Sequence, residues 1–214
     1  MILSTGRRYL FIHIPKTGGT ALALALEARA MKDDIMLGDT PKALRRRGRV
    51  AQGAARGRLR KHSTRADVEG LVPPEVLDEL FAFTLVRNPW DRAVSYYHWL
   101  RTQTFDHPAV ALARTLDFKG FVTAPQTIAA FQANPAASYL RSSDGQTRPA
   151  LYIRIEQFEE DAAPLIAHLG FPLALKRVNT SARARDHRTY YDEESAKAVA
   201  LACAEDIARF GYGF

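Results

Sequence analysis

Three short apolar runs divide the chain, and each is followed by a segment of helix-forming composition. The runs are YLFIHI at 9–14, FAFTLV at 81–86 and ALYIRIEQF at 150–158. Runs that are apolar at nearly every position, rather than at alternate positions, are typical of parallel strands buried on both faces. Strand, turn and helix in repeated succession therefore predict an α/β fold of three layers, in which helices flank a central parallel sheet.

The turn after the first run has the composition of an anion-binding loop. Pro15 ends the run, KTGGT follows at 16–20, and the helix-forming sequence ALALALEARAM begins directly afterwards. The N–H groups at the start of a helix attract anions, and adjacent glycines let the backbone approach closely. The lysine adds a mobile positive charge. The sequence predicts an anion site here, and an ordinary Gly-Gly turn is the alternative.

The residue order in this turn differs from that of the nucleoside-triphosphate P-loop. That loop places its lysine after the glycines, and a hydroxyl residue that binds magnesium comes next. Here Lys16 precedes Gly18 and Gly19, and the loop is shorter. The ligand that fits is an anionic group at the end of a nucleotide. The sequence has no His, Cys or Asp cluster with metal-ligand spacing, so we expect no metal.

The turn after the second run supplies a second set of candidate phosphate ligands. Arg87 leaves the strand, Pro89 is placed to start a helix, and Ser95 lies in the second turn of that helix. A guanidinium fork and a hydroxyl together suit a phosphate. Each residue also has a plainer role: an ion pair of Arg87 with Asp91, and packing of Ser95 against the sheet.

Composition is that of a soluble globular protein. The chain has 214 residues, of which 47% are hydrophobic and 25% charged, and we expect a single domain over 1–214. No apolar run reaches the roughly 18–20 residues of a membrane span. The first run begins within ten residues, which leaves no room for a signal peptide. One cysteine, Cys203, excludes an intrachain disulfide. We expect a cytoplasmic protein.

The net charge of +7 comes from one segment. Between Thr40 and Ala66 there are ten Lys or Arg residues and no acid, so the rest of the chain has three more acidic than basic residues. A basic segment on a mildly acidic body indicates a local anionic partner more than nucleic acid. A solvated arginine-rich loop is the alternative.

Taken in order, the two turns resemble the nucleotide-binding signatures of the sulfotransferases: PKTGGT after one strand and R-x-P-x-x-R-x-x-S after a later one. The succession FIHIPKTGGT, KHST, FTLVRNPWDRAVSYY, IRIEQFEED, VNTSAR and FGYGF is similar to the carbohydrate-type branch, which includes heparan sulfate 2-O-sulfotransferase and short bacterial proteins. The resemblance spans 9–214. It implies a P-loop-like fold and transfer of a sulfuryl group from 3′-phosphoadenosine 5′-phosphosulfate (PAPS) to a hydroxyl, with adenosine 3′,5′-bisphosphate as product.

The resemblance also implies roles for single residues. Arg87 and Ser95 would bind the 3′-phosphate, and Asn179 and Ser181 fall in a segment that closes over the nucleotide. His62, in KHST, falls where the branch places a catalytic base. The residues that would bind the 5′-phosphosulfate are Lys16, Thr17, Gly18, Gly19 and Thr20. The lysine would also stabilise the leaving phosphate, and no metal is required.

Histidine suits the base of this reaction, because the acceptor hydroxyl must lose a proton near neutral pH. Basic neighbours should lower the pKa of His62 and favour its neutral form. We interpret His13, between two isoleucines of the first run, as structural. Glu156 is an alternative base, or the partner of Arg154 in a buried salt bridge.

The acceptor implied by the resemblance is a saccharide or glycoconjugate. The basic segment 42–65 contains His62, and this adjacency favours an anionic acceptor. Two other functions stay open. A nucleotide-dependent phosphotransferase is opposed by the missing magnesium-binding hydroxyl. A nucleic-acid-binding protein is opposed by the localised charge and by the lack of a helix-turn-helix. A protein that binds PAPS without turnover is a further alternative.

Overall fold

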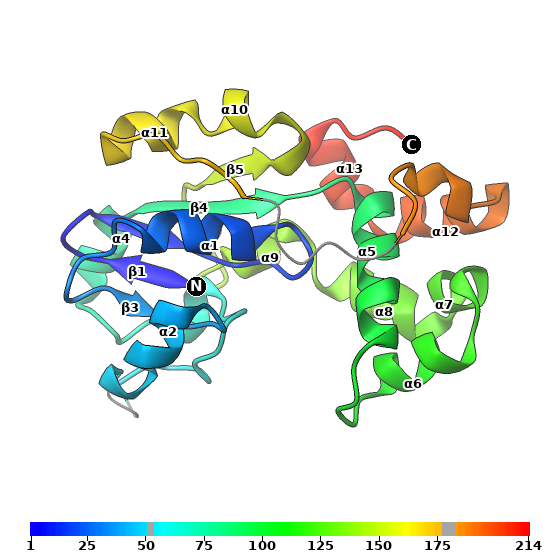
Figure 1. Ribbon diagram of the computed structural model, residues 1–214, viewed down its shortest axis with the longest axis horizontal. Helices are drawn as coiled ribbons and strands as arrows, with labels where there is room; N and C mark the ends of the chain where they lie inside the picture. Colours follow the sequence, from blue (N-terminus) through cyan, green and yellow to red (C-terminus); the bar gives the residue numbers. More distant parts are fainter. Residues whose placement is uncertain (51–53, 177–182) are drawn as a thin grey trace. The chain divides into compact units, whose positions relative to one another are not determined.

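The computed structural model describes residues 1–50, 54–176 and 183–214. The chain forms two compact units, whose elements Figure 1 labels. The first unit consists of Met1–Val86 and Ala136–Val178, and the second consists of Arg87–Pro135 and Asn179–Phe214. Asn179 and Ser181, which the resemblance assigns to the segment that closes over the nucleotide, lie outside the described residues.

A five-stranded sheet organises the first unit, in the order β3-β1-β2-β4-β5. The pairs β2–β4 and β4–β5 are parallel, as predicted. These are the three apolar runs of the sequence, although β2 and β5 are shorter than their runs. The strands are β1 (Ile2–Ser4), β2 (Tyr9–Phe11), β3 (Ile35–Met36), β4 (Phe81–Val86) and β5 (Leu151–Arg154).

Two strands were not expected from the sequence. β1 pairs antiparallel with β2 through a hairpin, and β3 pairs antiparallel with β1. The turn of the hairpin places Arg8 in the left-handed region, at φ 53°. Strands of two or three residues have too little length for a periodic pattern, so their pairing depends on the neighbouring strand. The sheet is therefore mixed, with its parallel part formed by β2, β4 and β5.

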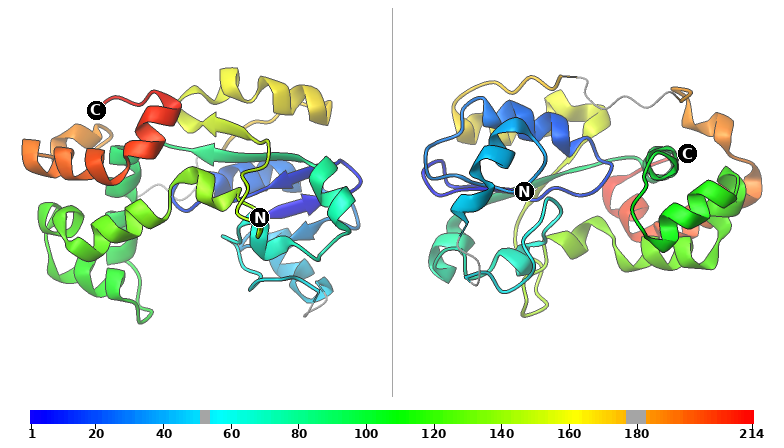
Figure 2. Two further views of the ribbon diagram at one scale, coloured as in Figure 1. Left: turned by 180° about the vertical axis from the view of Figure 1, so that it is seen from behind. Right: turned by 60° about the horizontal axis from the view of Figure 1, so that its bottom comes forward.

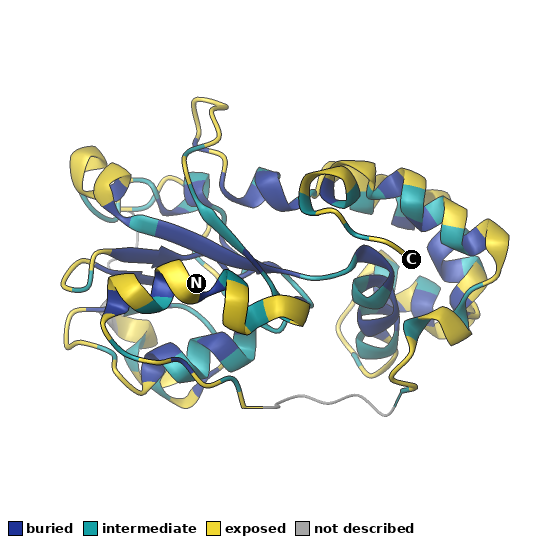
Figure 3. Cartoon of the chain, turned by 90° about the horizontal axis from the view of Figure 1, so that it is seen from above, coloured by how far each residue is buried: buried dark blue, intermediate teal, exposed yellow. Residues whose placement is uncertain are grey.

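Helices cover the sheet on both faces. Phe11, Phe83 and Ile153 share one core cluster with Leu22 of α1 and Leu165 of α11. The intervening strand residues are buried as well, and Figure 3 shows the sheet in dark blue. This explains the apolar character of consecutive positions. The helices of this unit are α1 (Gly19–Glu27), α2 (Pro41–Arg46), α3 (Arg65–Val68), α4 (Pro74–Glu79), α9 (Ala136–Tyr139), α10 (Phe158–Asp161) and α11 (Ala163–Leu169), with short 3-10 turns η1 (Arg47–Arg49) and η2 (Ile155–Gln157).

The second unit is helical in its described residues, and Figure 2 shows it in green, orange and red. Its core is rich in aromatic side chains, with Trp90, Tyr97 and Phe121 among them. The C-terminal Phe214 packs on Trp90, with ring centroids 5.4 Å apart. The helices are α5 (Pro89–Arg101), α6 (Pro108–Thr115), α7 (Phe118–Thr123), α8 (Pro125–Ala133), α12 (Glu193–Ala202) and α13 (Ala204–Phe210), with the 3-10 turn η3 (His187–Tyr190).

Proline, glycine and capping residues fix several helix ends. Pro89 is the first residue of α5, and the Asn88 side chain accepts a hydrogen bond from the N–H of Trp90 at 3.1 Å. Gly170, at φ 72°, ends α11 in the left-handed conformation that glycine adopts without strain. The C-terminal helical stretch breaks at Cys203 into α12 and α13. No local sequence signal marks that break.

Among the helices of the described residues, none has both the length and the apolar character to cross a membrane.

Candidate functional site

The glycine turn joins β2 to α1 in an unusual backbone conformation. Lys16 has φ 65° and Gly18 has φ 87°, so two of three consecutive residues are left-handed. The hydroxyl of buried Thr17 donates to the carbonyl of Ile14 at 2.9 Å and holds the turn together. A non-glycine residue in this region costs about 1–3 kcal/mol, and such residues gather at functional sites.

Both glycines of the turn are required by packing. A Cβ on Gly18 would lie 2.1 Å from Cδ1 of Ile155, and a Cβ on Gly19 would lie 2.3 Å from Cδ2 of His13. Neither position has room for a side chain. The Gly-Gly pair therefore lets the turn pack against two side chains of the first unit.

The start of α1 is electrostatically suited to an anion. Gly18 is the N-cap and provides no side-chain cap, and the first turn has no acidic residue. The first N–H groups of a helix have no partner within the helix, and the helix dipole places positive charge there. The hydroxyl of Thr17 is used within the turn, so this residue can offer a ligand its main-chain N–H.

Lys61 ties the KHST segment to the start of α1. Its ammonium group donates to Oγ1 of Thr20 at 3.2 Å and to Oδ2 of Asp39 at 2.9 Å. Thr20, Asp39 and Lys61 line a small pocket together with His13. The residue that precedes His62 in the sequence is thus connected directly to the predicted phosphosulfate-binding residues.

His62 is held in one neutral tautomer. Its Nδ1 lies 2.7 Å from the main-chain carbonyl oxygen of His13. Because a carbonyl can only accept, Nδ1 carries the proton and Nε2 has the free lone pair. Burial lowers the pKa of His62 to about 4, although the bond to the His13 carbonyl opposes this shift. At neutral pH the side chain is a base that can accept a proton at Nε2.

His13 is buried, and burial together with the nearby His62 holds its pKa well below the usual range. The two imidazole rings meet edge to face, with centroids 4.7 Å apart. His13 thus has the structural contacts expected of it. In addition, it touches both the glycine turn and His62, which sequence reasoning missed. The available signal was its position, three residues before Lys16.

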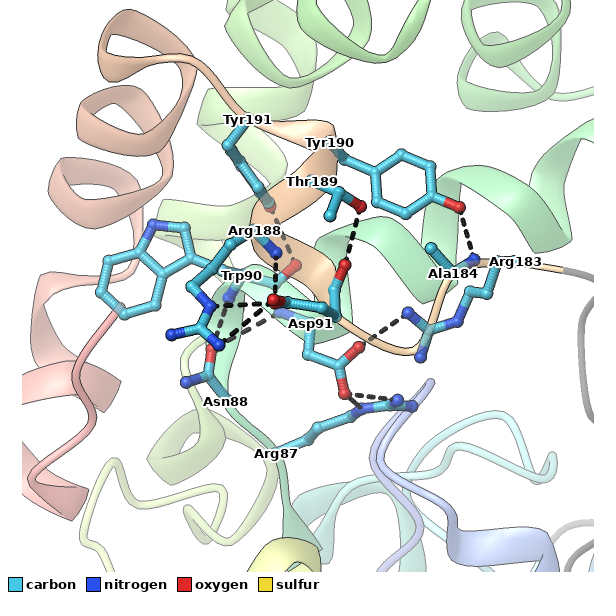
Figure 4. A network of polar contacts seen from close by, with 11 residues as sticks. Arg87, Asn88, Trp90, Asp91, Arg183, Ala184, Arg188, Thr189, Tyr190 and Tyr191 are labelled. Carbon is cyan, nitrogen blue, oxygen red and sulfur yellow. Dashed lines mark hydrogen bonds and ion pairs between the residues drawn. The ribbon is translucent and has the colours of Figure 1, made fainter.

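In the second unit, two arginines share the carboxylate of Asp91 (Figure 4). Arg87 donates from Nε to Oδ2 at 2.7 Å, and its Nη2 lies 2.6 Å from the same oxygen. Nη1 of Arg183 lies 2.8 Å from Oδ1, as an ion pair without hydrogen-bond geometry. The ion pair of Arg87 with Asp91, which the sequence offered as an alternative role, is therefore formed. The cluster of three side chains keeps one net positive charge, so it can still attract an anion.

Arg183 was not assigned a role from the sequence. Its side chain is only 12% exposed, and it belongs to the arginine-rich segment that follows VNTS. The signal was its place in the VNTSAR motif, but its partner is distant in sequence and could not be read from spacing.

A family model described as the sulfotransferase family matches residues 1–209. The chain belongs to the sulfotransferase family. Among solved structures, it is similar to mouse sulfotransferase SULT7A1 complexed with PAP, at 20% sequence identity and a TM-score of 0.37. The match covers 94% of this chain and 66% of the mouse chain, just under two thirds of its length. No curated protein sequence matches the chain.

The remaining predicted residues of this sulfotransferase-family chain differ in exposure. Ser95 lies on α5 and is 8% exposed, as its packing role would require. Glu156 is exposed, so the buried pair with Arg154 is wrong. Arg154 instead donates to both carboxylate oxygens of Asp161, at 2.7 and 2.8 Å.

Two further observations bear on the chemistry of the candidate site. Within the described ranges, no group of three or more His, Cys, Asp or Glu residues could hold a metal ion. Burial raises the pKa of Cys203 to about 11, so its thiol stays protonated at neutral pH and is not a nucleophile.

Proposed function

We propose that this protein transfers a sulfuryl group from PAPS to a hydroxyl of a saccharide or glycoconjugate. Family membership supports the reaction class. The observation that supports the mechanism most directly is the fixed tautomer of His62, within the unit that holds the glycine turn. One family model spans both compact units, so we treat 1–214 as a single sulfotransferase domain. The proposal keeps the cytoplasmic location that the composition favours.

The glycine turn is assigned to the 5′-phosphosulfate. Main-chain N–H groups of residues 17–20 donate to the anion, and the Lys16 ammonium adds charge. By resemblance, Arg87 and Ser95 bind the 3′-phosphate. Asn179 and Ser181 are proposed to close over the nucleotide, again by resemblance alone.

The proposed reaction is an in-line displacement at sulfur, similar in character to phosphoryl transfer. Nε2 of His62 takes the proton of the acceptor hydroxyl while its oxygen forms the new S–O bond. The bond between sulfur and the bridging phosphate oxygen breaks, and adenosine 3′,5′-bisphosphate leaves. Lys16 and the start of α1 stabilise the charge that develops on that oxygen. None of these steps uses a metal.

Calorimetric titration with adenosine 3′,5′-bisphosphate tests the nucleotide assignment. We expect the wild type to bind, and Lys16→Gln and Arg87→Gln each to weaken binding by about tenfold or more, because each removes a charged hydrogen-bond donor. Arg45→Gln, an exposed change on α2, is the matched control and should leave affinity unaltered.

Absence of binding by the wild type would refute the proposed function. Tighter binding of ATP than of the bisphosphate would instead favour a phosphotransferase.

A further inference from the structure

The hydroxyl of Thr20 has a hydrogen bond whose direction is fixed by its partner. Nζ of Lys61 lies 3.2 Å from Oγ1 of Thr20. An ammonium group has no lone pair, so the lysine donates and the hydroxyl oxygen accepts. The hydroxyl proton remains for another acceptor, and no residue in the described ranges takes it. Thr20 is half-buried and is the second residue of α1, so this O–H is a donor available at the predicted phosphosulfate site.

The ammonium group of Lys61 is held in place before any ligand binds. It lies 2.9 Å from Oδ2 of Asp39, and the lysine side chain is 25% exposed. The next residue, His62, bonds to the carbonyl of His13 at 2.7 Å, which fixes the main chain from which Lys61 projects. A long side chain that is already ordered loses little further conformational freedom when a ligand arrives.

The segment that contains Asp39 is itself tied to α1. Thr40 is the N-cap of α2, and its hydroxyl donates to a carboxylate oxygen of Glu27, the last residue of α1. The same oxygen accepts from the N–H of Ala43 at 3.0 Å. Glu27 and Thr40 are buried. The ion-pair partner of Lys61 therefore has a fixed place relative to the helix that begins at the glycine turn.

The charge of Lys61 is balanced at this position, because Asp39 neutralises it. Its effect on an anion at the start of α1 is therefore mainly one of orientation. A hydroxyl that accepts a hydrogen bond from a cation is polarised, and its own O–H becomes a stronger donor. With the lysine on one side of the oxygen, the proton is also directed away from the lysine.

We propose that Lys61 is a positioning residue for the sulfuryl donor, which orients and polarises the hydroxyl of Thr20 toward the 5′-phosphate of PAPS. The inference rests on the proposed function, in which Thr20 belongs to the phosphosulfate-binding turn. Lys61 itself needs no bond to the nucleotide. The KHST segment then has two tasks: His62 acts on the acceptor hydroxyl, and the residue before it acts on the donor.

A double-mutant cycle between Lys61 and Thr20 tests this role. Calorimetry measures the affinity for adenosine 3′,5′-bisphosphate, which keeps the 5′-phosphate. Thr20→Val removes the hydroxyl with little change of shape, and it should weaken binding about tenfold or more, because a hydrogen bond to a charged group is lost. Lys61→Met should weaken binding about three- to tenfold, because the hydroxyl remains but is neither oriented nor polarised.

A positioning role requires that the effect of Lys61 vanish when the hydroxyl is absent. The variant K61M/T20V should therefore bind as T20V does, whereas K61M should still weaken binding in T20S, which retains a hydroxyl. A lysine that only supports the loop, or that contacts the bisphosphate directly, would weaken binding by the same factor in the wild-type, T20S and T20V backgrounds. That result would overturn the proposal, and so would full affinity of K61M or of T20V.

Lys119→Met is the matched control. The Lys119 ammonium also bridges two carboxylates, those of Asp192 at 2.7 Å and Glu194 at 2.6 Å, and all three residues belong to the second unit. The control should bind the bisphosphate as the wild type does, and a loss equal to that of K61M would overturn the proposal. Melting temperatures are measured in parallel, and K61A replaces K61M in the cycle if the methionine variant does not fold.

The wild type separates this inference from the proposed function. A wild type that does not bind the bisphosphate refutes both the sulfotransferase mechanism and the role of Lys61. A wild type that binds, with additive effects in the cycle, refutes the role of Lys61 alone.

Discussion

The tautomer of His62 depends on one main-chain atom, the carbonyl oxygen of His13. A neutral imidazole that donates from Nδ1 can accept a proton only at Nε2, so this hydrogen bond sets the acid–base role of His62. The acceptor is a main-chain oxygen, and a substitution of the His13 side chain does not remove it directly. This is the residue-scale feature on which the mechanism depends.

His62→Gln should lower kcat by about 10²–10⁴-fold, because the amide cannot take the proton of the acceptor. The affinity for adenosine 3′,5′-bisphosphate should stay the same. Rates with labelled PAPS and calorimetry measure the two effects. His168→Gln, at an exposed histidine that contacts the carbonyl of Arg7, is the control. A comparable loss of rate in the control would argue against a specific role for His62.

Acid should lower the stability of the folded protein. Burial holds the pKa of His62 at about 4 in the folded protein, below the ordinary histidine value of 6.5. The unfolded chain therefore binds more protons than the folded one between these values, and stability falls as pH falls through this range. Urea unfolding at pH 7, 6 and 5 measures the slope. In His62→Gln the slope should be smaller by up to one proton, and an unaltered slope would contradict this account.

Gly19→Ala should displace His13 and with it the carbonyl that orients His62. The new Cβ would lie 2.3 Å from the ring, and overpacking of this kind costs about 1–3 kcal/mol. The melting temperature and kcat should both decrease. Gly48→Ala is the matched control, since a Cβ there would meet no atom within 4 Å. Retention of full activity by Gly19→Ala would show that the orientation of His62 does not depend on this packing.

At the scale of elements, a charge cluster lies at the start of α5. Arg87 and Asp91 are four residues apart, so their ion pair could be predicted from spacing, whereas Arg183 is distant from both in sequence. The cluster therefore ties the start of α5 to the segment that leads into η3.

Asp91→Asn should lower the free energy of unfolding by about 1–3 kcal/mol, because two poorly exposed guanidinium groups lose their shared carboxylate. Urea denaturation measures the change. Glu205→Gln, which breaks an exposed pair with Arg209, should cost less than about 0.5 kcal/mol. Equal effects of the two changes would mean that the cluster contributes no more than a surface ion pair.

For the molecule as a whole, the sequence predicted the parallel strands and the starts of α1 and α5, because these depend on local composition. Pro89 acts within a few residues of its own position, and the run at 81–86 has the bounds of β4. Contacts between segments that are distant in sequence could not be predicted. The pairing of β1 with β3, and the bond from His62 to the carbonyl of His13, join segments whose partners no spacing rule identifies.

At Lys16 the requirements of folding and of ligand binding differ: the left-handed backbone favours glycine, whereas the proposed ligand needs the lysine side chain. A lysine at φ 65° is strained where a glycine would not be, so a residue chosen for stability alone would have no side chain there. Lys16→Gly should therefore fold at least as stably as Lys16→Gln while binding adenosine 3′,5′-bisphosphate equally poorly. The difference in unfolding free energy between the two variants would measure the backbone strain that the protein tolerates in order to keep one ammonium group at its glycine turn.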